Sequence, residues 1–325
     1  MKLSSKLLVC ALAVLLFVPK GEARKVWVGV PTLSMVVIAF TAAEEKRFYK
    51  EEDLDVELVW MSAPAAAQAL IGGNVEFSTV SGSAIPAIIG GAPLRFIFTS
   101  YNRPMFWLFS KPEIADVRAL KGRKIGVSGI GSGPATLLIE ILKRNGLDGG
   151  RDAAILSLGR MPDIAAGLFS GAVDAAMIAP PFHVTAQEAG FRELVSFLKE
   201  DFVELQGSIV IREELLKSDP LLLERFVRGT LKGLTYAREQ RSGTIPILAR
   251  YLKIKEDEAA KYYDSVRPVM TADGTVSEDQ LQKFLQVAAQ RLRAKETLPL
   301  EKVFDYSVTK KIYAELRAKG WRPKP

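Results

Sequence analysis

One segment of this chain occurs twice, without gaps and at a constant offset of 98 residues. Residues 64–76 align on residues 162–174, with Pro, Ala, Leu, Gly and Val recurring in register. In each copy Pro can open a helix, Gly can close it in a left-handed turn, and Val can lead into a strand. Any helix-to-strand unit would share part of this pattern. The gapless register nevertheless favours two similar α/β lobes.

The sequence around each copy extends it into a series of strands and helices. The first series is predicted to have strands over 25–30, 54–60, 75–80 and 94–99, with helices over 40–50, 65–71 and 84–89. The second is predicted to have strands over 124–127, 154–158 and 175–179, with helices over 134–145, 164–169 and 185–190. Alternation of this kind implies mainly parallel sheets with helices on both faces.

The C-terminal third is predicted to be helical, over 221–240, 245–251, 257–266, 279–295 and 310–319. Ser277 and Gln280 have capping-box spacing at the start of the fourth of these helices. If these helices pack on the first lobe, the chain crosses between the lobes twice, which forms a hinge beside a ligand cleft. We therefore predict lobe 1 from residues 24–105 with 208–325, and lobe 2 from residues 106–207.

The N-terminus is typical of a secretory signal peptide. Lys2 and Lys6 precede an apolar run over residues 7–18, which is followed by a proline and small residues. Twelve apolar residues are too few to span a hydrocarbon layer of about 30 Å. We predict that residues 1–23 are removed. Cleavage would take away the only cysteine, Cys10, and lower the net charge from +7 to +5, because three lysines and one glutamate leave.

Composition excludes several classes of protein and site. The chain is 48% hydrophobic and 25% charged, as in ordinary globular proteins, and not as in disordered or collagen-like chains. One cysteine cannot form an internal disulfide, and with a single histidine it leaves too few ligands for a His/Cys zinc site. Basic and acidic residues are interspersed along the C-terminal helices, whereas nucleic-acid binding requires a basic stripe. We expect no metal, no cofactor and no nucleic-acid partner.

Candidate ligand-binding residues lie in the loops after the predicted strands, because parallel α/β sheets bind ligands at the carboxyl ends of their strands. Hydroxyls and glycines there let backbone amides approach a ligand, and the helix N-termini after Ser83 and Gly133 favour an anion. The candidates are Thr32, Ser34, Ser62, Ser81, Gly82, Ser83, Asn102, Arg103, Ser128, Ser132, Gly133, Arg160, Pro180, Phe182 and His183.

The charge of these loops favours an anionic or neutral ligand. None of the loops contains Asp or Glu, whereas Arg103 and Arg160 are cationic. A cationic ligand would normally be met by a carboxylate. Alternatives remain for each residue: either arginine could point to solvent or form an interlobe ion pair. His183 could be a satisfied polar residue at a helix start, and Phe182 could belong to the core.

Motifs for catalysis are incomplete in this chain. Residues 129–134 read Gly-x-Gly-x-Gly-Pro, so Pro134 stands where the dinucleotide fingerprint requires Gly. The chain contains neither a Gly-x-x-x-x-Gly-Lys-Ser/Thr phosphate loop nor a Gly-x-Ser-x-Gly nucleophile elbow. A carboxylate pair for glycoside chemistry remains open, but no such pair falls in the predicted loops. We therefore expect a binding protein without catalytic residues.

Several short motifs, taken in order, resemble a known family. They are Lys50-Glu-Glu-Asp-Leu-Asp-Val-Glu57, Gly73-Asn-Val-Glu-Phe77, Ser81-Gly-Ser83, Leu120-Lys-Gly-Arg-Lys-Ile-Gly-Val127, Gly171-Ala-Val-Asp174, Pro180-Pro-Phe182 and Val303-Phe-Asp-Tyr-Ser307. Together they resemble the nitrate/sulfonate/taurine group of ABC-transporter substrate-binding proteins, which also covers thiamine-pyrimidine precursor binders. The family usually has Gly in place of Asp53, and Asp tolerates the left-handed conformation of that turn.

The resemblance implies a type II periplasmic-binding-protein fold, with two α/β lobes joined by a two-crossing hinge. It implies an exported, periplasmic protein that captures a small anionic or neutral organic solute, or an oxyanion, between the lobes. Delivery would be to an inner-membrane ABC permease with its ATPase, and we expect a monomer. The group also contains pyrimidine-synthase enzymes on the same fold. That alternative would need a reactive His/Cys-rich cluster, which this chain lacks.

Overall fold

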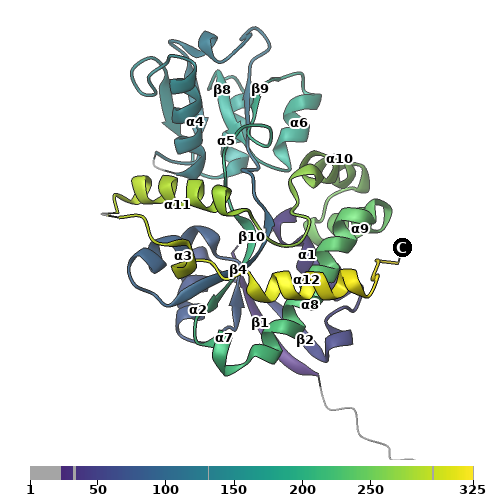
Figure 1. The fold of residues 1–325 in the computed structure, drawn as a ribbon. Coiled ribbons are helices and arrows are strands. Elements are labelled where there is room, and N and C mark those ends of the chain that lie inside the picture. The colour runs from purple at the N-terminus through teal and green to yellow at the C-terminus, as the bar shows by residue number, and fades with distance from the viewer. Residues whose placement is uncertain (1–22, 32–33, 131, 295, 325) are drawn as a thin grey trace, which may run out of the picture.

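The computed structural model describes residues 23–31, 34–130, 132–294 and 296–324, and these form two five-stranded sheets (Figure 1). Sheet A has the order β2 (Leu54–Trp60), β1 (Arg24–Val30), β3 (Phe77–Ser78), β10 (Gln206–Arg212) and β4 (Leu94–Tyr101). Sheet B has the order β7 (Ala154–Ser157), β6 (Lys124–Val127), β8 (Ala175–Ile178), β5 (Trp107–Ser110) and β9 (Arg192–Ser196). We call the units built around sheets A and B lobe 1 and lobe 2.

Each sheet contains one strand that runs against its neighbours, so the mainly parallel sheets predicted from the sequence are mixed. β10 pairs antiparallel with β3 and β4, and β5 pairs antiparallel with β8 and β9. Both are the first strands after a crossing between lobes. The chain therefore enters each sheet from the edge that faces the other lobe, and this reverses the direction of the entering strand.

The repeated sequence segment forms the same unit in both lobes, as predicted. Helices α2 (Ala63–Ile71) and α5 (Met161–Phe169) begin and end 98 residues apart, and both carry a proline in their first turn. The glycines that follow them, Gly73 and Gly171, have φ angles of 78° and 79°. These left-handed turns favour glycine, which has no Cβ to clash. The structure thus confirms two similar α/β units.

Four other helices belong to the α/β parts of the lobes: α1 (Ile38–Glu45), α3 (Ser81–Ile89), α4 (Gly133–Arg144) and α6 (Phe182–Glu188). The helix predicted over 40–50 is wrong at its end, because the chain turns at Arg47 with a φ of 61°. Asp53 has a φ of 55°, which is the left-handed conformation expected where the family has Gly. The helix placed after Ser83 begins earlier, at Ser81, and the strand predicted over 75–80 is reduced to β3.

The C-terminal helices pack on lobe 1 (Figure 1). They are α7 (Leu215–Ser218), α8 (Pro220–Glu239), α9 (Arg241–Leu252), α10 (Glu256–Val266), α11 (Glu278–Leu292) and α12 (Ser307–Ala318). Helix α8 approaches α1 so closely that a Cβ at Gly233 would overlap the carbonyl oxygen of Ala39. Ser277 caps α11, as predicted, by accepting from the Gln280 amide at 3.4 Å. Helix α11 ends at Leu292, three residues before its predicted end.

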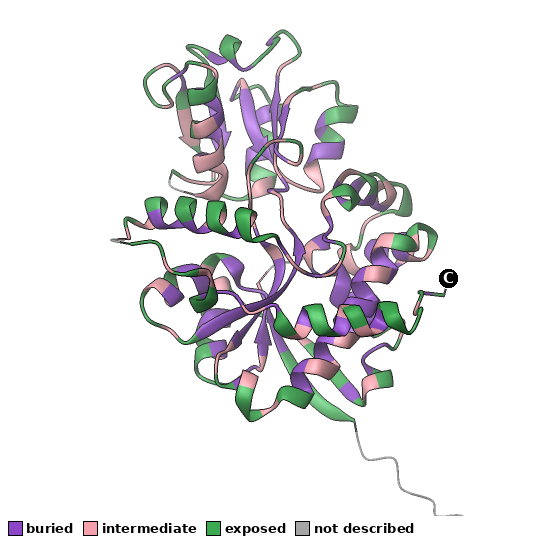
Figure 2. Ribbon diagram, in the orientation of Figure 1, coloured by how far each residue is buried: buried purple, intermediate pink, exposed green. Residues whose placement is uncertain are grey.

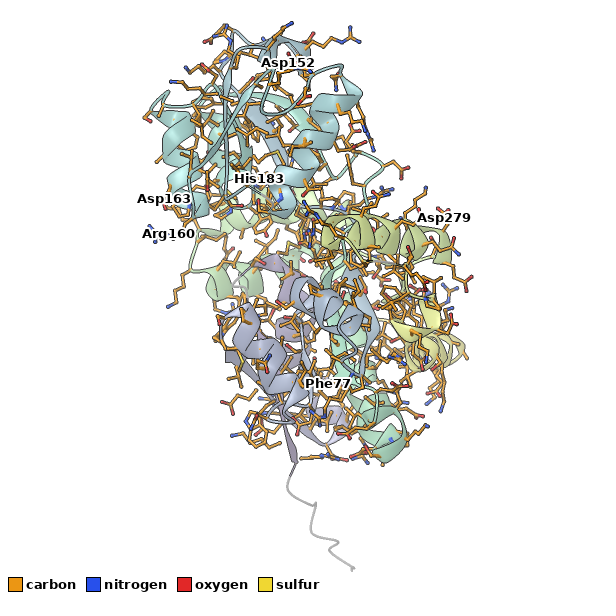
Figure 3. All side chains as sticks on the ribbon, turned by 90° about the vertical axis from the view of Figure 1, so that its left-hand side faces the viewer. Phe77, Asp152, Arg160, Asp163, His183 and Asp279 are labelled. Atoms are coloured by element: carbon orange, nitrogen blue, oxygen red, sulfur yellow. The ribbon has the colours of Figure 1, made fainter. Side chains whose placement is uncertain are left out.

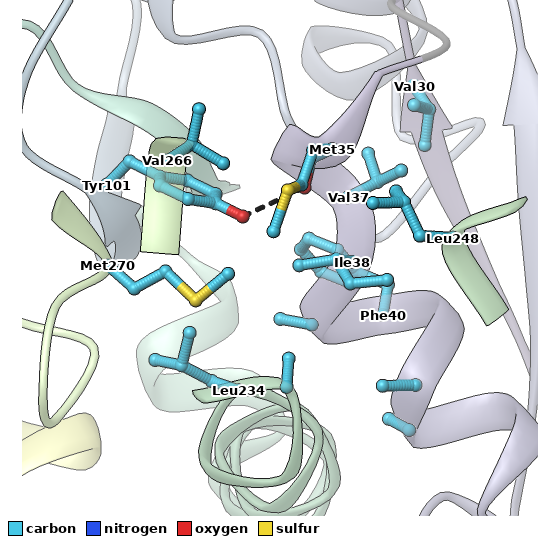
Figure 4. Packing of buried hydrophobic residues seen from close by; sticks show 14 of the residues in the cluster. Val30, Met35, Val37, Ile38, Phe40, Tyr101, Leu234, Leu248, Val266 and Met270 are labelled. Atoms are coloured by element: carbon cyan, nitrogen blue, oxygen red, sulfur yellow. Dashed lines mark hydrogen bonds between the residues drawn. The ribbon is translucent and has the colours of Figure 1, made fainter. Parts of the chain in front are cut away.

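Buried residues make up all of strand β4 and most of β10 in sheet A, and they face the sheet from the helices around it (Figure 2). At the edge of sheet A that faces lobe 2, Tyr101 is fully buried, and its hydroxyl donates to the Met35 carbonyl at 3.0 Å (Figure 4). Met270, which precedes α11, packs in the same cluster. The core therefore fixes the end of β4 against the start of the first helical segment.

Two short segments, residues 102–106 and 197–205, connect the lobes, and they are tied to each other. The Arg103 guanidinium donates to the carbonyls of Glu200 and Phe202 at 2.8 and 3.1 Å. It also lies 3.6 Å from the Asp201 carboxylate, and the Glu204 amide donates to the Asn102 carbonyl at 3.4 Å. Strand β10 begins at Gln206, two residues before the lobe boundary expected at 208.

The predicted signal peptide lies, except for its last residue, outside the described residues. Within the described part of the chain, no helix is both long and apolar enough to cross a membrane.

Candidate functional site

The sequence-predicted residues lie on the loops and helix starts between the two sheets. Arg160, Asp163 and His183 are at the edge of lobe 2 that faces lobe 1 (Figure 3). Ser83 lies in the first turn of α3, and Phe182 opens α6 after a cis peptide bond between Pro180 and Pro181. Thr32 lies outside the described residues.

Three of the predicted serines cap helices that begin at this level. Ser34, Ser62 and Ser132 each accept a hydrogen bond from a backbone amide two or three residues later, at 3.4 Å. Ser128 donates to the Ser132 hydroxyl at 3.0 Å. Capping fixes the helix N-termini, and a helix N-terminus carries partial positive charge that favours an anion.

Three buried hydroxyls at the interlobe edge of sheet A have no hydrogen-bond partner among the described residues. They belong to Thr79, Ser81 and Ser100, which lie at the ends of β3 and β4. Strand β10 runs between these two strands, and a Cβ at Gly207 would stand 3.1 Å from the Ser100 hydroxyl. Leaving a buried hydroxyl unpaired costs about 1–3 kcal/mol. These hydroxyls therefore mark a place where a polar ligand or water would be stabilised.

A cavity of about 320 Å³ is lined by one of these three residues, Ser81, and is shared by both lobes. Ser81 and Gly82 at the start of α3 face it from lobe 1, and Gly133 at the start of α4 faces it from lobe 2. Helix α11, which lies between α3 and α4 in Figure 1, forms its outer wall. The apolar lining comes from Ile85, Leu137, Val203, Leu205, Phe284, Val287 and Ala288.

Two opposite charges that were not among the sequence candidates also line this cavity, Glu204 from the second crossing and Arg291 from α11. Burial raises the pKa of the Glu204 carboxyl above its usual value, while a hydrogen bond with Gln206 and the charge of Arg291 act in the opposite direction. A Cβ at Gly133 would stand 3.9 Å from an Arg291 guanidinium nitrogen. The guanidinium therefore reinforces the positive N-terminus of α4.

The expectation that carboxylates are absent from the cleft holds for the loops but not for the whole cavity. Glu204 lies in a crossing segment, and no strand predicted from the sequence ends there. Arg291 stands on a helix more than 200 residues from Ser81 and Gly82 in the chain. Only the packing of α11 against lobe 1 brings it to the site. Thr79 and Ser100 could have been found as the polar residues at the ends of apolar strands.

The two predicted arginines have partners within the protein. Arg103 holds the second crossing through the Glu200 and Phe202 carbonyls. Arg160 pairs with Asp163 at 3.1 Å, and its side chain is 82% exposed. Asn102 donates to the side chain of Gln280 at 3.2 Å, which ties the first crossing to α11. Contact of these three residues with a ligand stays a prediction.

His183 borders a different cavity, of about 480 Å³, between lobe 2 and α10. The ring is 4% exposed and stacks on Trp107 at 4.2 Å between centroids. Its Nε2 lies 2.9 Å from the Ser265 hydroxyl, which donates to the Tyr262 carbonyl. Burial lowers the pKa of His183 to about 4. The ring therefore packs as a neutral group in this interface.

No group of three or more His, Cys, Asp or Glu side chains in the described ranges is placed to hold a metal ion. The polar groups around the cavity between the lobes are hydroxyls, helix N-termini, the Arg291 guanidinium and the Glu204 carboxyl. This arrangement can bind an anionic group by hydrogen bonds and charge.

A family model described as NMT1/THI5 like matches residues 34–242 of the chain. No curated protein sequence matches it. Among solved structures, the periplasmic aliphatic sulphonate binding protein SsuA from Escherichia coli is similar. The two share 20% identity over 86% of this chain and 91% of that chain, with a TM-score of 0.70.

Two further structures show the same similarity of fold. The periplasmic nitrate-binding protein NrtA from Synechocystis PCC 6803 shares 12% identity over 91% of this chain and 90% of that one, with a TM-score of 0.70. The desulfurization enzyme DszB shares 15% identity over 90% of this chain and 99% of that one, also with a TM-score of 0.70. These likenesses confirm the predicted fold, two α/β lobes joined by two crossings.

Proposed function

Since the chain belongs to the NMT1/THI5-like family, we propose that it is an exported solute-binding protein. It captures a small anionic or neutral organic solute, or an oxyanion, between its lobes and delivers it to an ABC importer. The observation that carries this proposal is the set of buried hydroxyls of Thr79, Ser81 and Ser100. Among the residues that the structure describes they have no hydrogen-bond partner, and they lie at the edge of sheet A that faces lobe 2, where parallel α/β lobes bind ligands.

The proposed ligand contacts come from both lobes. From lobe 1, the hydroxyls of Ser81 and Ser100 donate to the ligand, together with backbone amides at the start of α3. From lobe 2, the amides at the start of α4 receive its anionic group, assisted by Arg291. A ligand held by both lobes has more contacts in the closed state than in the open one, so binding shifts the equilibrium toward closure. Ser34, Ser62, Ser83, Ser128 and Ser132 complete the proposed rim of the cleft.

The names of two structural neighbours support an anionic ligand. SsuA is named for aliphatic sulphonates and NrtA for nitrate, and both of these solutes are anions. In this chain the same charge preference follows from helix N-termini and the guanidinium of Arg291 around one cavity. We propose an organic anion or oxyanion as the solute on these grounds.

Catalysis is the second candidate, because DszB has the same fold and has been crystallised as a variant with biphenyl-2-sulfinic acid. The chain offers few residues for such a role. Its only cysteine, Cys10, falls in the predicted signal peptide, and its only histidine, His183, packs between Trp107 and Ser265. We therefore propose binding without turnover.

Export through cleavage after residue 23 belongs to the same proposal. The cationic start and the apolar run of residues 7–18 support it, as do the periplasmic proteins among the structural neighbours. Fractionation of expressing cells should find the shortened chain in the periplasm. Uncut protein in the cytosol would contradict export.

Thermal denaturation of the mature protein with a panel of ligands tests the proposed function. The panel contains nitrate, sulfonates, carboxylates and neutral heteroaromatic compounds. A ligand at 100 times its Kd should stabilise the folded state by about 2.7 kcal/mol. The stabilisation should be lost in Ser81→Ala and retained in Ser170→Ala, a substitution of an exposed serine outside the cleft. If no ligand stabilises the protein, binding is contradicted, and chemical conversion of one of them would favour the enzyme.

A further inference from the structure

The cavity under α11 has more apolar surface than an inorganic oxyanion requires. Side chains from α3, α4, the second crossing and α11 give it an apolar wall. Val287 contributes to this wall although it is 53% exposed, and Phe284 is only partly buried. When the hydrocarbon part of a ligand covers apolar surface in a cavity, the removal of that surface from water favours binding.

The polar and apolar parts of the cavity are separated along its walls. On α3, Ser81 at the start is followed one turn later on the same face by Ile85. On α4, Gly133 at the start is followed one turn later by Leu137, and all four residues line the cavity. Residues four apart on a helix are neighbours on one face. Each helix thus offers amides at its first turn and apolar surface at its second.

Helix α11 is held in place by contacts near its N-terminus. Gln280 accepts from Asn102 at 3.2 Å, and Lys283 lies 3.5 Å from Asp201, so both crossings anchor this half of the helix. From its middle to its C-terminus the helix carries Phe284, Val287 and Arg291 to the cavity. The helix lies outside residues 34–242, the part that the family model matches.

We propose that this cavity is a specificity subsite for the apolar part of an organic monoanion. The anionic group lies at the starts of α3 and α4 beside Arg291, and the hydrocarbon part lies against Leu137, Phe284 and Val287. Glu204 also lines the cavity, and its carboxyl, when ionised, repels a second anionic group on the ligand. The inference rests on the proposed function, because it assigns the ligand class of the same cleft.

Calorimetric titration of the mature protein with two homologous series tests the subsite. The probes are n-alkanesulfonates and n-alkanecarboxylates with one to six carbons in the chain. Affinity should rise about threefold to fourfold for each methylene group that the cavity covers. This rise of affinity with chain length should appear in whichever series, sulfonate or carboxylate, carries the anionic group that the protein binds.

Substitutions on α11 locate the subsite. Val287→Trp fills the cavity from a half-exposed position, so it should abolish the dependence of affinity on chain length. Gln282→Trp, on the opposite face of α11, is the control and should change neither the dependence of affinity on chain length nor the affinity for the shortest anion. Phe284→Ala enlarges the cavity and should move the best chain length upward. These two variants provide readouts that do not depend on the folding of Val287→Trp.

The role of Glu204 has its own readout. Hexane-1,6-disulfonate should bind at least tenfold more weakly than hexanesulfonate. Glu204→Gln should reduce this difference between the two affinities, and an unchanged difference would mean that Glu204 does not repel the second anionic group.

The subsite is overturned, and the proposed function stands, if short anions bind but affinity does not rise with chain length. The same conclusion follows if affinity rises with chain length as steeply in Val287→Trp as in the original protein. The same holds if only ligands without an apolar group bind. If neither these series nor the wider ligand panel binds, both proposals fail.

Discussion

Ser100 and Ser208 are both fully buried near the interlobe edge of sheet A, but only one of them has a partner. The Ser208 hydroxyl lies 3.0 Å from that of Thr99, whereas the Ser100 hydroxyl has no partner among the described residues. A paired hydroxyl contributes to stability, and an unpaired one costs free energy unless a ligand or water meets it. At the scale of single residues, this contrast separates a structural serine from one available for binding.

We predict opposite effects of alanine at these two serines. Ser208→Ala should lower the free energy of unfolding by about 1 kcal/mol, because it breaks a buried hydrogen bond. Ser100→Ala should leave it unchanged or raise it by about 1 kcal/mol, and should weaken ligand binding. Urea denaturation of the ligand-free protein measures both. Equal destabilisation by the two substitutions would mean that Ser100 is structural.

His183 should make the folded protein sensitive to acid. Its pKa is lowered to about 4 by burial, whereas an unfolded chain has a histidine pKa of about 6.5. The neutral ring is favoured in the folded state, so its full contribution is present above pH 6.5 and is lost as the pH falls toward 4. The loss should approach about 3 kcal/mol.

Urea denaturation between pH 4.5 and 7 measures this effect. His183→Gln should show a smaller loss of stability over that range than the original protein. An unchanged pH dependence would mean that His183 titrates normally and that carboxyl groups produce the slope.

At the scale of helices and strands, the repeat was predictable, but strands β5 and β9 were not. Pro, Leu and Gly at fixed spacing are local signals, and they placed α2 and α5 nearly at their observed bounds. Strand β5 is a four-residue, fully buried strand without alternation, and β9 begins with two charged residues. Such strands carry little periodic signal, because their conformation is set by the neighbouring strands.

The contact between α1 and α8 gives a prediction at this scale. Gly233→Ala should destabilise the protein by about 1–3 kcal/mol or more, because the added Cβ overlaps the backbone of α1 and forces the helices apart. Gly82→Ala on α3 is the matched control, since nothing lies within 4 Å of its Cβ position. It should be neutral or slightly stabilising. Thermal denaturation compares them, and equal effects would show that α1 and α8 tolerate separation.

At the scale of the whole molecule, the two lobes and the hinge followed from the sequence, but the full site did not. Ser81, Gly82 and Gly133 were predicted from loop positions and meet at one cavity. Glu204 and Arg291 were missed, because a crossing segment and a C-terminal helix reach the site only through tertiary packing. The local sequence pattern identifies site residues that follow the strands of a sheet. It does not identify site residues on segments that are far away in the chain and reach the site by packing.

Closure of the lobes on a ligand is the central claim, and an interlobe distance measures it directly. The mature chain contains no cysteine if cleavage follows residue 23, so Gln68→Cys in lobe 1 and Lys143→Cys in lobe 2 give two exposed labelling sites. Spin labels at these positions report the distance between α2 and α4. Adding an anion that stabilises the protein should shift the distances to shorter values. Saturating binding with an unchanged distance distribution would contradict capture between the lobes.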